Sequence, residues 1–282
     1  MRSYHQRLEG EPVIVHENAL KKIWSEGGAA INGWLGLPSS FSAEIMAHAG
    51  WNSLTIDMQH GLIDYQTAVH MLQGLSSTDV TPLVRVPWND PGIIMKMLDA
   101  GALGVICPMI NSRAEAERLV QACRYAPRGQ RSFGPVRAAV HYGADYSKNA
   151  DDAVVVFAMI ETKMALDALD EILGTPELDA IYIGPSDLSG SLTGKFGFDH
   201  AEGTVQFEAI EHILAAAKRH NIVPGIHTAS PQYAAKMIAL GFQFVTVASD
   251  TKLLEAGARA AVDAMRGSRG EIPAAANTSS AY

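Results

Sequence analysis

Short apolar segments rich in β-branched residues alternate with longer amphipathic segments along most of this 282-residue chain. This alternation constrains the fold most strongly, because it is typical of α/β proteins with a parallel sheet. The expected strands cover residues 29–37, 53–59, 81–88, 104–110, 154–161, 180–187, 223–229 and 244–250. Each is followed by a segment with helical spacing of apolar residues. Eight such units over about 250 residues predict a (β/α)8 TIM barrel.

The segment before the first strand, "NALKKIWSEG" (18–27), predicts an N-terminal helix that caps the lower mouth of the barrel. The alternative fold is an open doubly wound sheet, which begins with a Gly-rich phosphate turn after its first strand. "GLPSSFSAEI" (36–45) is not such a turn. We expect one barrel domain over residues 1–266 and a disordered tail over 267–282, where the sequence is small, polar and aperiodic.

The composition argues against several classes of protein. The formal net charge of −8 disfavours a nucleic-acid-binding protein, which needs a basic face. No apolar run approaches the roughly 18–20 residues of a membrane span, and the first residues lack the apolar stretch of a signal peptide. The two cysteines, Cys107 and Cys123, favour a reducing compartment without disulfides. We expect a cytoplasmic protein that binds neither nucleic acid nor a membrane.

Polar, ionisable or indole side chains stand at or just after the carboxyl ends of most expected strands. They are Trp34, Asp57, His60, Arg85, Glu161, Asp187, His227, Ser249 and Asp250. In (β/α)8 barrels the chemistry lies at these ends, because packed side chains fill the interior. Each such group costs desolvation free energy unless it is paired, so their gathering at one mouth predicts an active site. Further candidates for the pocket lining are Arg131 and Arg137.

Glu161 and Asp187 end strands that are one β–α–β unit apart, so their strands should be neighbours. Two carboxylates this close repel each other unless a cation lies between them. Carboxylate oxygens, with water and substrate in the remaining positions, describe a Mg²⁺ or Mn²⁺ site. The alternative is that each carboxylate only caps a helix or turn.

Arg85 and His60 are candidates for catalysis. Arg85 lies in the apolar stretch "LVRVPW" and needs a partner, which is either a substrate anion or a carboxylate in a structural salt bridge. His60 follows a strand end, where a general base is reasonable, although a surface loop histidine is equally consistent. Asp57 and Asp99 are the carboxylates that could orient His60, the alternative for Asp99 being a surface group at a helix end.

Seven motifs in this order resemble one known family. They are "GWLGLPSS", "IDMQHG", "VRVPWNDP", "MLDAG", "RYAPRGQRSFGP", "MIET" and "IYIGPSDLS". Over residues 20–265 the chain resembles the HpcH/HpaI aldolases, metal-dependent class II pyruvate aldolases that include 4-hydroxy-2-oxoheptanedioate aldolase. The resemblance implies a (β/α)8 barrel assembled into homohexamers.

The resemblance also implies roles for particular residues. Glu161 and Asp187 would hold a divalent cation, Mg²⁺, Mn²⁺ or Co²⁺, and the backbone amides of Ser186 and Asp187 would hold the pyruvate carboxylate. Arg85 would stabilise the enolate, and His60 would accept the proton. The resemblance gives Asp99 the role of raising the basicity of that histidine, acting across a subunit boundary. Trp34 and His227 would contact the substrate.

The reaction expected from the resemblance is reversible retro-aldol cleavage of a 4-hydroxy-2-oxo acid to pyruvate, or hydroxypyruvate, and an aldehyde. This chain has Met159 where some members have Gln, Gln59 where some have Glu, and His227 where the heptanedioate enzymes have an aliphatic residue. These differences bear on the choice of substrate. No expected strand contains a lysine, which argues against a Schiff-base aldolase.

Two other functions are consistent with a barrel of this kind. A barrel similar to the citrate lyase β subunit would cleave an acyl-CoA and would need a basic groove for the nucleotide, and the sequence has no such basic cluster. A non-catalytic metabolite-binding barrel would be expected to lose at least one of Glu161, Asp187, Arg85 and His60, and all four are present.

Overall fold

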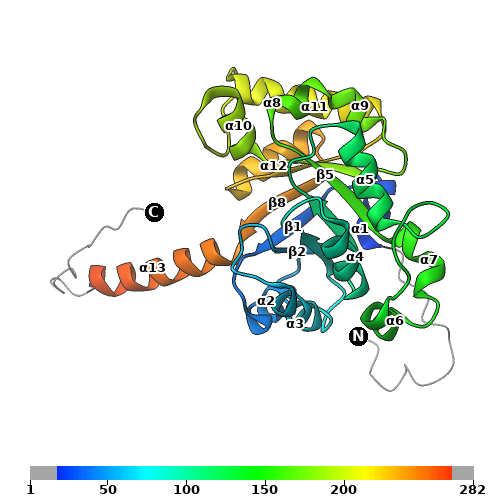
Figure 1. Cartoon of the computed structure of the whole chain (residues 1–282). Helices are drawn as coiled ribbons and strands as arrows, with labels where there is room; N and C mark the ends of the chain where they lie inside the picture. The colour runs from blue at the N-terminus through cyan, green and yellow to red at the C-terminus, as the bar shows by residue number, and fades with distance from the viewer. Residues whose placement is uncertain (1–17, 269–282) are drawn as a thin grey trace.

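The computed structural model describes residues 18–268 and contains a closed barrel of parallel strands in the order β1 to β8 (Figure 1). The strands are β1 (Ala30–Leu35), β2 (Ser53–Asp57), β3 (Thr81–Arg85), β4 (Gly104–Cys107), β5 (Val155–Ile160), β6 (Ala180–Ile183), β7 (Val223–His227) and β8 (Phe244–Ser249). Each strand pairs with its neighbour in sequence, and β1 pairs with β8. The predicted TIM barrel is confirmed, and the open sheet is wrong.

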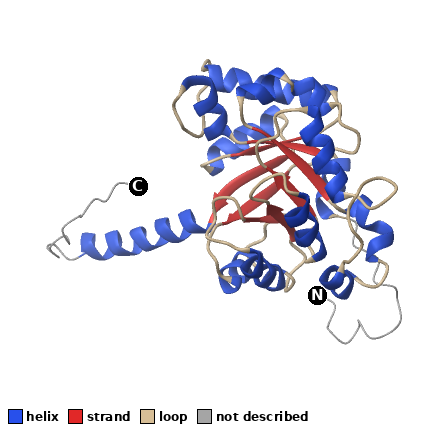
Figure 2. Ribbon diagram, viewed as in Figure 1, coloured by secondary structure: helices blue, strands red, loops and turns tan. Residues whose placement is uncertain are grey.

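The helices surround the strands on the outside (Figure 2). They are α1 (Ala19–Ser25), α2 (Ser40–Ala47), α3 (Tyr65–Leu75), α4 (Pro91–Asp99), α5 (Arg113–Cys123), α6 (Val136–Tyr142), α7 (Tyr146–Ala153), α8 (Lys163–Asp167), α9 (Leu169–Leu173), α10 (Pro185–Thr193), α11 (Val205–Arg219), α12 (Pro231–Leu240) and α13 (Asp250–Ser268). Ser39, Asp64, Ser112 and Ser230 each begin a helix by accepting a hydrogen bond from the N–H three residues later.

Strand alternation decides which side chains enter the barrel. In β5, Phe157 and Met159 belong to an inner core, whereas Val156 and Ile160 pack in an outer core beneath the helices. Glu161 is the next inward position after Met159. The same period of two makes inward positions of Trp34, Asp57, Arg85, Tyr182, His227 and Thr246. The residues expected to carry chemistry therefore point inward, like the inner core, and lie at its carboxyl-terminal end.

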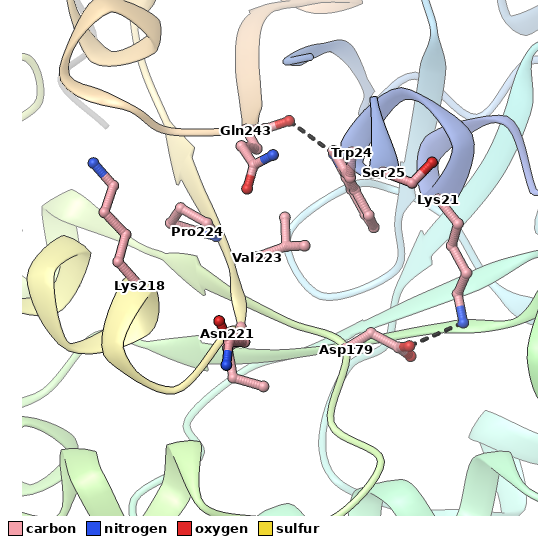
Figure 3. Close-up of a pocket in the computed structure, with 10 residues that line it drawn as sticks. Lys21, Trp24, Ser25, Asp179, Lys218, Asn221, Val223, Pro224 and Gln243 are labelled. Carbon is pink, nitrogen blue, oxygen red and sulfur yellow. Dashed lines mark hydrogen bonds and ion pairs between the residues drawn. The ribbon is translucent and has the colours of Figure 1, made fainter. Parts of the chain in front are cut away.

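Helix α1 caps the amino-terminal mouth of the barrel, as predicted. Leu20 and Trp24 are buried in the inner core, and the Trp24 ring makes edge contacts with Phe157 and Phe244. Trp24 Nε1 donates a hydrogen bond of 2.8 Å to the carbonyl oxygen of Gln243 (Figure 3). The inner core is thus covered at this end of the barrel.

Helix α13 runs outward from the end of β8 instead of returning along the barrel (Figure 1). Among residues 250–266 of this helix, only Asp250 is buried, and its carboxylate accepts hydrogen bonds from the N–H groups of Gly36 and Leu37. Residues 251–266 are all exposed. The helix that should complete the eighth unit therefore does not pack against its own barrel.

The structure shifts several predicted boundaries. Strand β6 ends at Ile183 instead of at residue 187, because Gly184 and Pro185 begin α10. Helix α13 continues through Ser268, past the predicted boundary at residue 267. The rest of the predicted tail, 269–282, lies outside the described residues. Within residues 18–268, no helix is both long enough and apolar enough to cross a membrane.

Candidate active site

A pocket of about 480 Å³ opens at the carboxyl ends of the strands. It is lined by seven of the predicted site residues, namely Trp34, His60, Arg85, Glu161, Ser186, Asp187 and His227, but not by Asp99. Asp99 ends α4, and because each barrel helix runs antiparallel to the strands, it lies toward their amino ends. Its carboxylate accepts a hydrogen bond of 2.7 Å from Arg131 Nη2. Within one chain, the structure does not bring Asp99 and His60 together.

Arg85 and Asp57 form a bidentate ion pair in the pocket wall. Arg85 Nε and Nη2 donate hydrogen bonds of 2.8 and 2.6 Å to the two oxygens of Asp57, which also accepts one from Trp34 Nε1 at 3.1 Å. The guanidinium lies 4.8 Å from the centre of the Trp34 ring. Burial alone would raise the pKa of Asp57, but the hydrogen bonds and charge of Arg85 lower it. Nη1 takes no part in these bonds to Asp57.

Glu161 is a buried carboxylate without a cationic partner among the described residues. Its Oε1 accepts a hydrogen bond of 2.7 Å from the N–H of Met109. Burial raises the pKa of Glu161 to about 7, and the negative charge of Asp187 adds to this rise. The two carboxylates are thus close enough for the charge of Asp187 to act on Glu161, although Asp187 lies in the first turn of α10 and not on strand β6.

Met109 follows β4, the strand that ends without a charged residue, and contributes a backbone N–H to the site. Its backbone has a φ of +56°, in the left-handed region that non-glycine residues rarely adopt. This turn aims the Met109 N–H at Glu161. Strain of this kind is concentrated at functional sites. Sequence reasoning missed this contact, because nothing in "GVICPMI" marks a methionine for positive φ.

The start of α10 lines the pocket next to Glu161. Gly184 is the N-cap of α10, and a Cβ at this position would overlap the Glu161 carboxylate. The next N–H groups, those of Ser186 and Asp187, lie in the first turn, where a helix leaves its amides unpaired. Such a turn attracts anions.

These features fit a divalent cation between Glu161 and Asp187. A buried carboxylate with a raised pKa gains from a neighbouring positive charge, and Gly184 leaves room against that carboxylate. In the described part of the chain, no group of three or more His, Cys, Asp or Glu residues could hold a metal ion. A cation here would take its remaining oxygen ligands from water and substrate, as Mg²⁺ commonly does.

His60 has an exposed side chain on the pocket rim. Its backbone N–H donates a hydrogen bond of 3.2 Å to Asp57 Oδ1, and the N–H of Gln59 donates one of 3.0 Å to the same oxygen. Asp57 therefore positions the loop that carries His60, whereas the sequence left open whether Asp57 would orient the imidazole itself.

Tyr182 and Phe198 line the pocket and were not among the predicted residues. Tyr182 Oη lies 2.9 Å from His227 Nδ1, and its ring stacks on Trp34 with centroids 5.8 Å apart. Phe198 packs at an angle against the His227 ring. An inward tyrosine in "AIYI" was a usable signal, since a buried hydroxyl needs a partner.

Two other predicted pocket residues lie elsewhere. Arg131 stacks on Tyr125 and pairs with Asp99, and Arg137 donates hydrogen bonds to the carbonyl oxygen of Ala100 and to Ser76 Oγ. The expectation that Arg131 and Arg137 line the pocket is wrong. Both arginines therefore hold the carboxyl-terminal end of α4, and Arg137 also connects it to the end of α3.

A second hollow of about 480 Å³ lies at the opposite, amino-terminal end of the barrel (Figure 3). Lys21 Nζ pairs with Asp179 at 2.9 Å, and Lys218 Nζ donates a hydrogen bond to the carbonyl oxygen of Leu240. Both ammonium groups of its lining are therefore already engaged. None of the predicted site residues reaches this hollow.

Comparison with known proteins agrees with this arrangement. The model of the family described as HpcH/HpaI aldolase/citrate lyase matches residues 31–256. The chain is 43% identical over 242 residues to a hydroxypyruvate/pyruvate aldolase of Rhizorhabdus wittichii, covering 86% of this chain and 96% of the relative. It is 39% identical over 247 residues to a 4-hydroxy-2-oxo-heptane-1,7-dioate aldolase of Klebsiella pneumoniae, covering 86% and 92%.

Among solved structures, an HpcH/HpaI aldolase/citrate lyase family protein of Burkholderia cenocepacia superposes with a TM-score of 0.82. It is 30% identical, and the match covers 88% of this chain and 99% of that one. The similarity therefore extends over the whole barrel.

Proposed function

The chain belongs to the HpcH/HpaI aldolase/citrate lyase family, and we propose from this that it is a class II aldolase. Its reaction is the reversible cleavage of a 4-hydroxy-2-oxo acid to pyruvate, or hydroxypyruvate, and an aldehyde. The observation that carries the proposal is the meeting of the Glu161–Asp187 carboxylate pair and Arg85 in one pocket. The relatives named as aldolases support the same reaction.

A divalent cation, Mg²⁺, Mn²⁺ or Co²⁺, would be held by Glu161 and Asp187. When bound, it supplies Lewis-acid polarisation of the ketone oxygen of a 2-oxo acid. The hydrogen bond from the Met109 N–H holds Glu161 in position for this, and the absence of a side chain at Gly184 leaves room for its carboxylate.

The chain's own groups orient the 2-oxo acid. The amides of Ser186 and Asp187, at the start of α10, bind its carboxylate. Arg85 is fixed by two hydrogen bonds to Asp57, so its guanidinium is held rigidly where negative charge develops on the enolate oxygen. A donor that does not have to reorganise during the reaction stabilises that charge most effectively.

His60 accepts the proton of the C4 hydroxyl, directly or through a water molecule, as the C3–C4 bond breaks. Its exposed side chain in the pocket lining supports this role, because a group there can reach a substrate that enters from solvent. If Asp99 raises the basicity of His60, it does so from a second copy of the chain, because the two residues lie far apart within one.

We also propose that the protein is a homo-oligomer, and specifically the hexamer that the family resemblance implied. Leu254, Ala258 and Ala261 lie on one side of the projecting helix α13 at spacings of four and three residues, and all are exposed. We propose that this side of α13 packs against a second copy of the chain. The two cysteines are buried free thiols, which supports a reducing cytoplasmic location.

The test is pyruvate release from 4-hydroxy-2-oxo acids, measured before and after removal of metal with EDTA and again after Mn²⁺ is restored. We expect activity to disappear and return. Cleavage that persists without metal contradicts the proposal, and so does cleavage confined to CoA thioesters.

A further inference from the structure

Buried hydrogen bonds run from the barrel interior to the pocket wall at His227. Tyr182 Oη lies 2.9 Å from His227 Nδ1 and 2.5 Å from Thr246 Oγ1. Asn32 Nδ2 lies 3.0 Å from the same threonine oxygen. Asn32, Thr246 and Tyr182 are fully buried, so each of their protons needs an acceptor inside the protein.

The orientation of Asn32 sets the direction of these bonds. Ser53 Oγ and Thr55 Oγ1 donate to Asn32 Oδ1 at 2.8 and 3.1 Å, so Asn32 Nδ2 donates to Thr246. The reversed amide would leave the hydroxyl protons of Ser53 and Thr55 without a hydrogen-bond acceptor among the described residues. An unpaired buried donor carries its full desolvation penalty, which disfavours that arrangement.

The proton of Thr246 then determines the tautomer of His227. Thr246 Oγ1 accepts from Asn32, and its own proton has Tyr182 Oη as its remaining partner in the described structure. Tyr182 accepts from Thr246 and therefore donates to His227 Nδ1. The proton of a neutral His227 must then be on Nε2. Burial, aided by the charge of Arg85, lowers the pKa of His227 to about 4, so the ring is neutral.

His227 thus presents an N–H donor to the pocket. Nδ1 is engaged by Tyr182, which leaves Nε2 as the ring nitrogen available to the pocket that His227 lines. The ring is fixed between Trp34, at a centroid distance of 5.1 Å, and Phe198, at 5.8 Å. Strand β7, which carries His227, pairs directly with β6, whose end begins the Gly184–Asp187 turn.

A 2-oxo acid bound at the amides of Ser186 and Asp187, as proposed above, would lie beside the strand that carries this donor. We propose that His227 is a specificity-determining residue that donates a hydrogen bond from Nε2 to a hydroxyl oxygen on C3 of the 2-oxo acid. The preferred nucleophile is then a 3-hydroxy-2-oxo acid such as hydroxypyruvate, rather than pyruvate. Tyr182, Thr246 and Asn32 are positioning residues that fix the tautomer. This inference rests on the proposed aldolase activity.

The first test compares kcat/KM for hydroxypyruvate and for pyruvate, each with D-glyceraldehyde. His227→Leu should lower the hydroxypyruvate-to-pyruvate ratio about 10-fold, the value of one hydrogen bond. His70→Leu, on the exposed face of α3, is the matched control and should leave the ratio unchanged. An unchanged ratio in His227→Leu overturns the inference. Absence of aldol formation with both substrates in the wild type contradicts the proposed function instead.

The second test is independent of turnover. Neutron diffraction from crystals of the perdeuterated protein should show deuterium on His227 Nε2 and none on Nδ1. Tyr182→Phe removes the hydroxyl that fixes this tautomer, and it should reduce the donor ratio while thermal unfolding shows that the variant remains folded. Deuterium on Nδ1 of the wild type, or an unaltered ratio in Tyr182→Phe, overturns the assigned direction of the hydrogen bonds.

Discussion

The Arg85 guanidinium and the Asp57 carboxylate face each other through two hydrogen bonds of 2.8 and 2.6 Å, at the ends of adjacent strands. The pair is nearly buried and lies against the Trp34 ring. Arg85 is therefore both half of an internal ion pair and a wall of the pocket. The sequence predicts a carboxylate or a substrate anion as the partner of Arg85, and this geometry allows it to contact both at once.

Arg85→Ala should remove the donor to the enolate oxygen and lower kcat by about 10²–10³-fold. It should also lower the free energy of unfolding by about 3–5 kcal/mol, because Asp57 is left as a buried, unpaired charge. Steady-state kinetics and chemical denaturation measure the two effects. Arg113→Ala, which breaks an exposed pair with Glu117, should change neither appreciably. Wild-type turnover in Arg85→Ala would count against the proposed role.

Glu161→Gln should keep an oxygen for the Met109 N–H but lose the negative charge. We expect Mn²⁺ binding, followed by titration calorimetry, to weaken at least 10-fold, and the increase in melting temperature on adding Mn²⁺ to disappear. Glu117→Gln on the surface of α5 is the control. Unchanged Mn²⁺ affinity in Glu161→Gln would exclude this carboxylate as a ligand.

Gly184→Ala tests the fit of the backbone to the site. The added methyl group would overlap the Glu161 carboxylate and displace it, so Mn²⁺ affinity and kcat should both fall while the barrel still folds. Gly257→Ala on α13 lies outside the pocket and has open space around its Cβ, so it should leave Mn²⁺ affinity unaltered. Full activity in Gly184→Ala would contradict this packing.

The stability of the protein should depend on pH through His227. Its pKa is near 6.5 in the unfolded chain and about 4 in the folded state, because burial disfavours the charged ring. The unfolded state therefore binds more protons between these pH values. The stability that neutral His227 contributes is complete above pH 6.5 and is lost as the pH falls toward 4, by about 3 kcal/mol.

Chemical denaturation of wild type and His227→Leu between pH 4 and 8 measures this contribution as the difference between the two curves. We expect the plots of unfolding free energy against pH for the two proteins to differ in slope only below about pH 6.5. Parallel curves throughout would mean that His227 titrates alike in both states. His70→Leu, whose side chain is exposed, should follow the wild type.

Leu254→Arg should disrupt association through α13, because it places a charge in the middle of the apolar side of this helix. Light scattering should show a smaller particle, and activity should fall if Asp99 acts across a subunit boundary. Lys252→Ala, on the charged side of α13, is the control. A monomeric wild type, or an unaltered mass in Leu254→Arg, would contradict the proposed assembly.

The order of strands and helices could be predicted from the sequence because both periodicities are local. The sequence also indicated that Glu161 stands at the end of an apolar strand, whereas its inward direction, shared with Phe157 and Met159, is seen only in the structure. The pairing of β5 with β6, the strands that precede Glu161 and Asp187, could be predicted because the strands of a β–α–β unit are usually neighbours. These features depend on residues close together in the chain or on one crossover.

Other features were decided only by the tertiary structure. Asn32 and Thr246 meet because β1 pairs with β8, 214 residues away, when the barrel closes. The partner of Arg85 and the tautomer of His227 depend on the register between strands.

The chain by itself thus determined the order of strands and helices and which side chains stand at the strand ends, since both follow from local patterns of apolar residues. Three-dimensional folding decided which of them share a hydrogen bond, which lies apart, as Asp99 does, and where α13 points. Buried polar groups must find partners, and the identity of each partner is fixed only once the strands have closed around them.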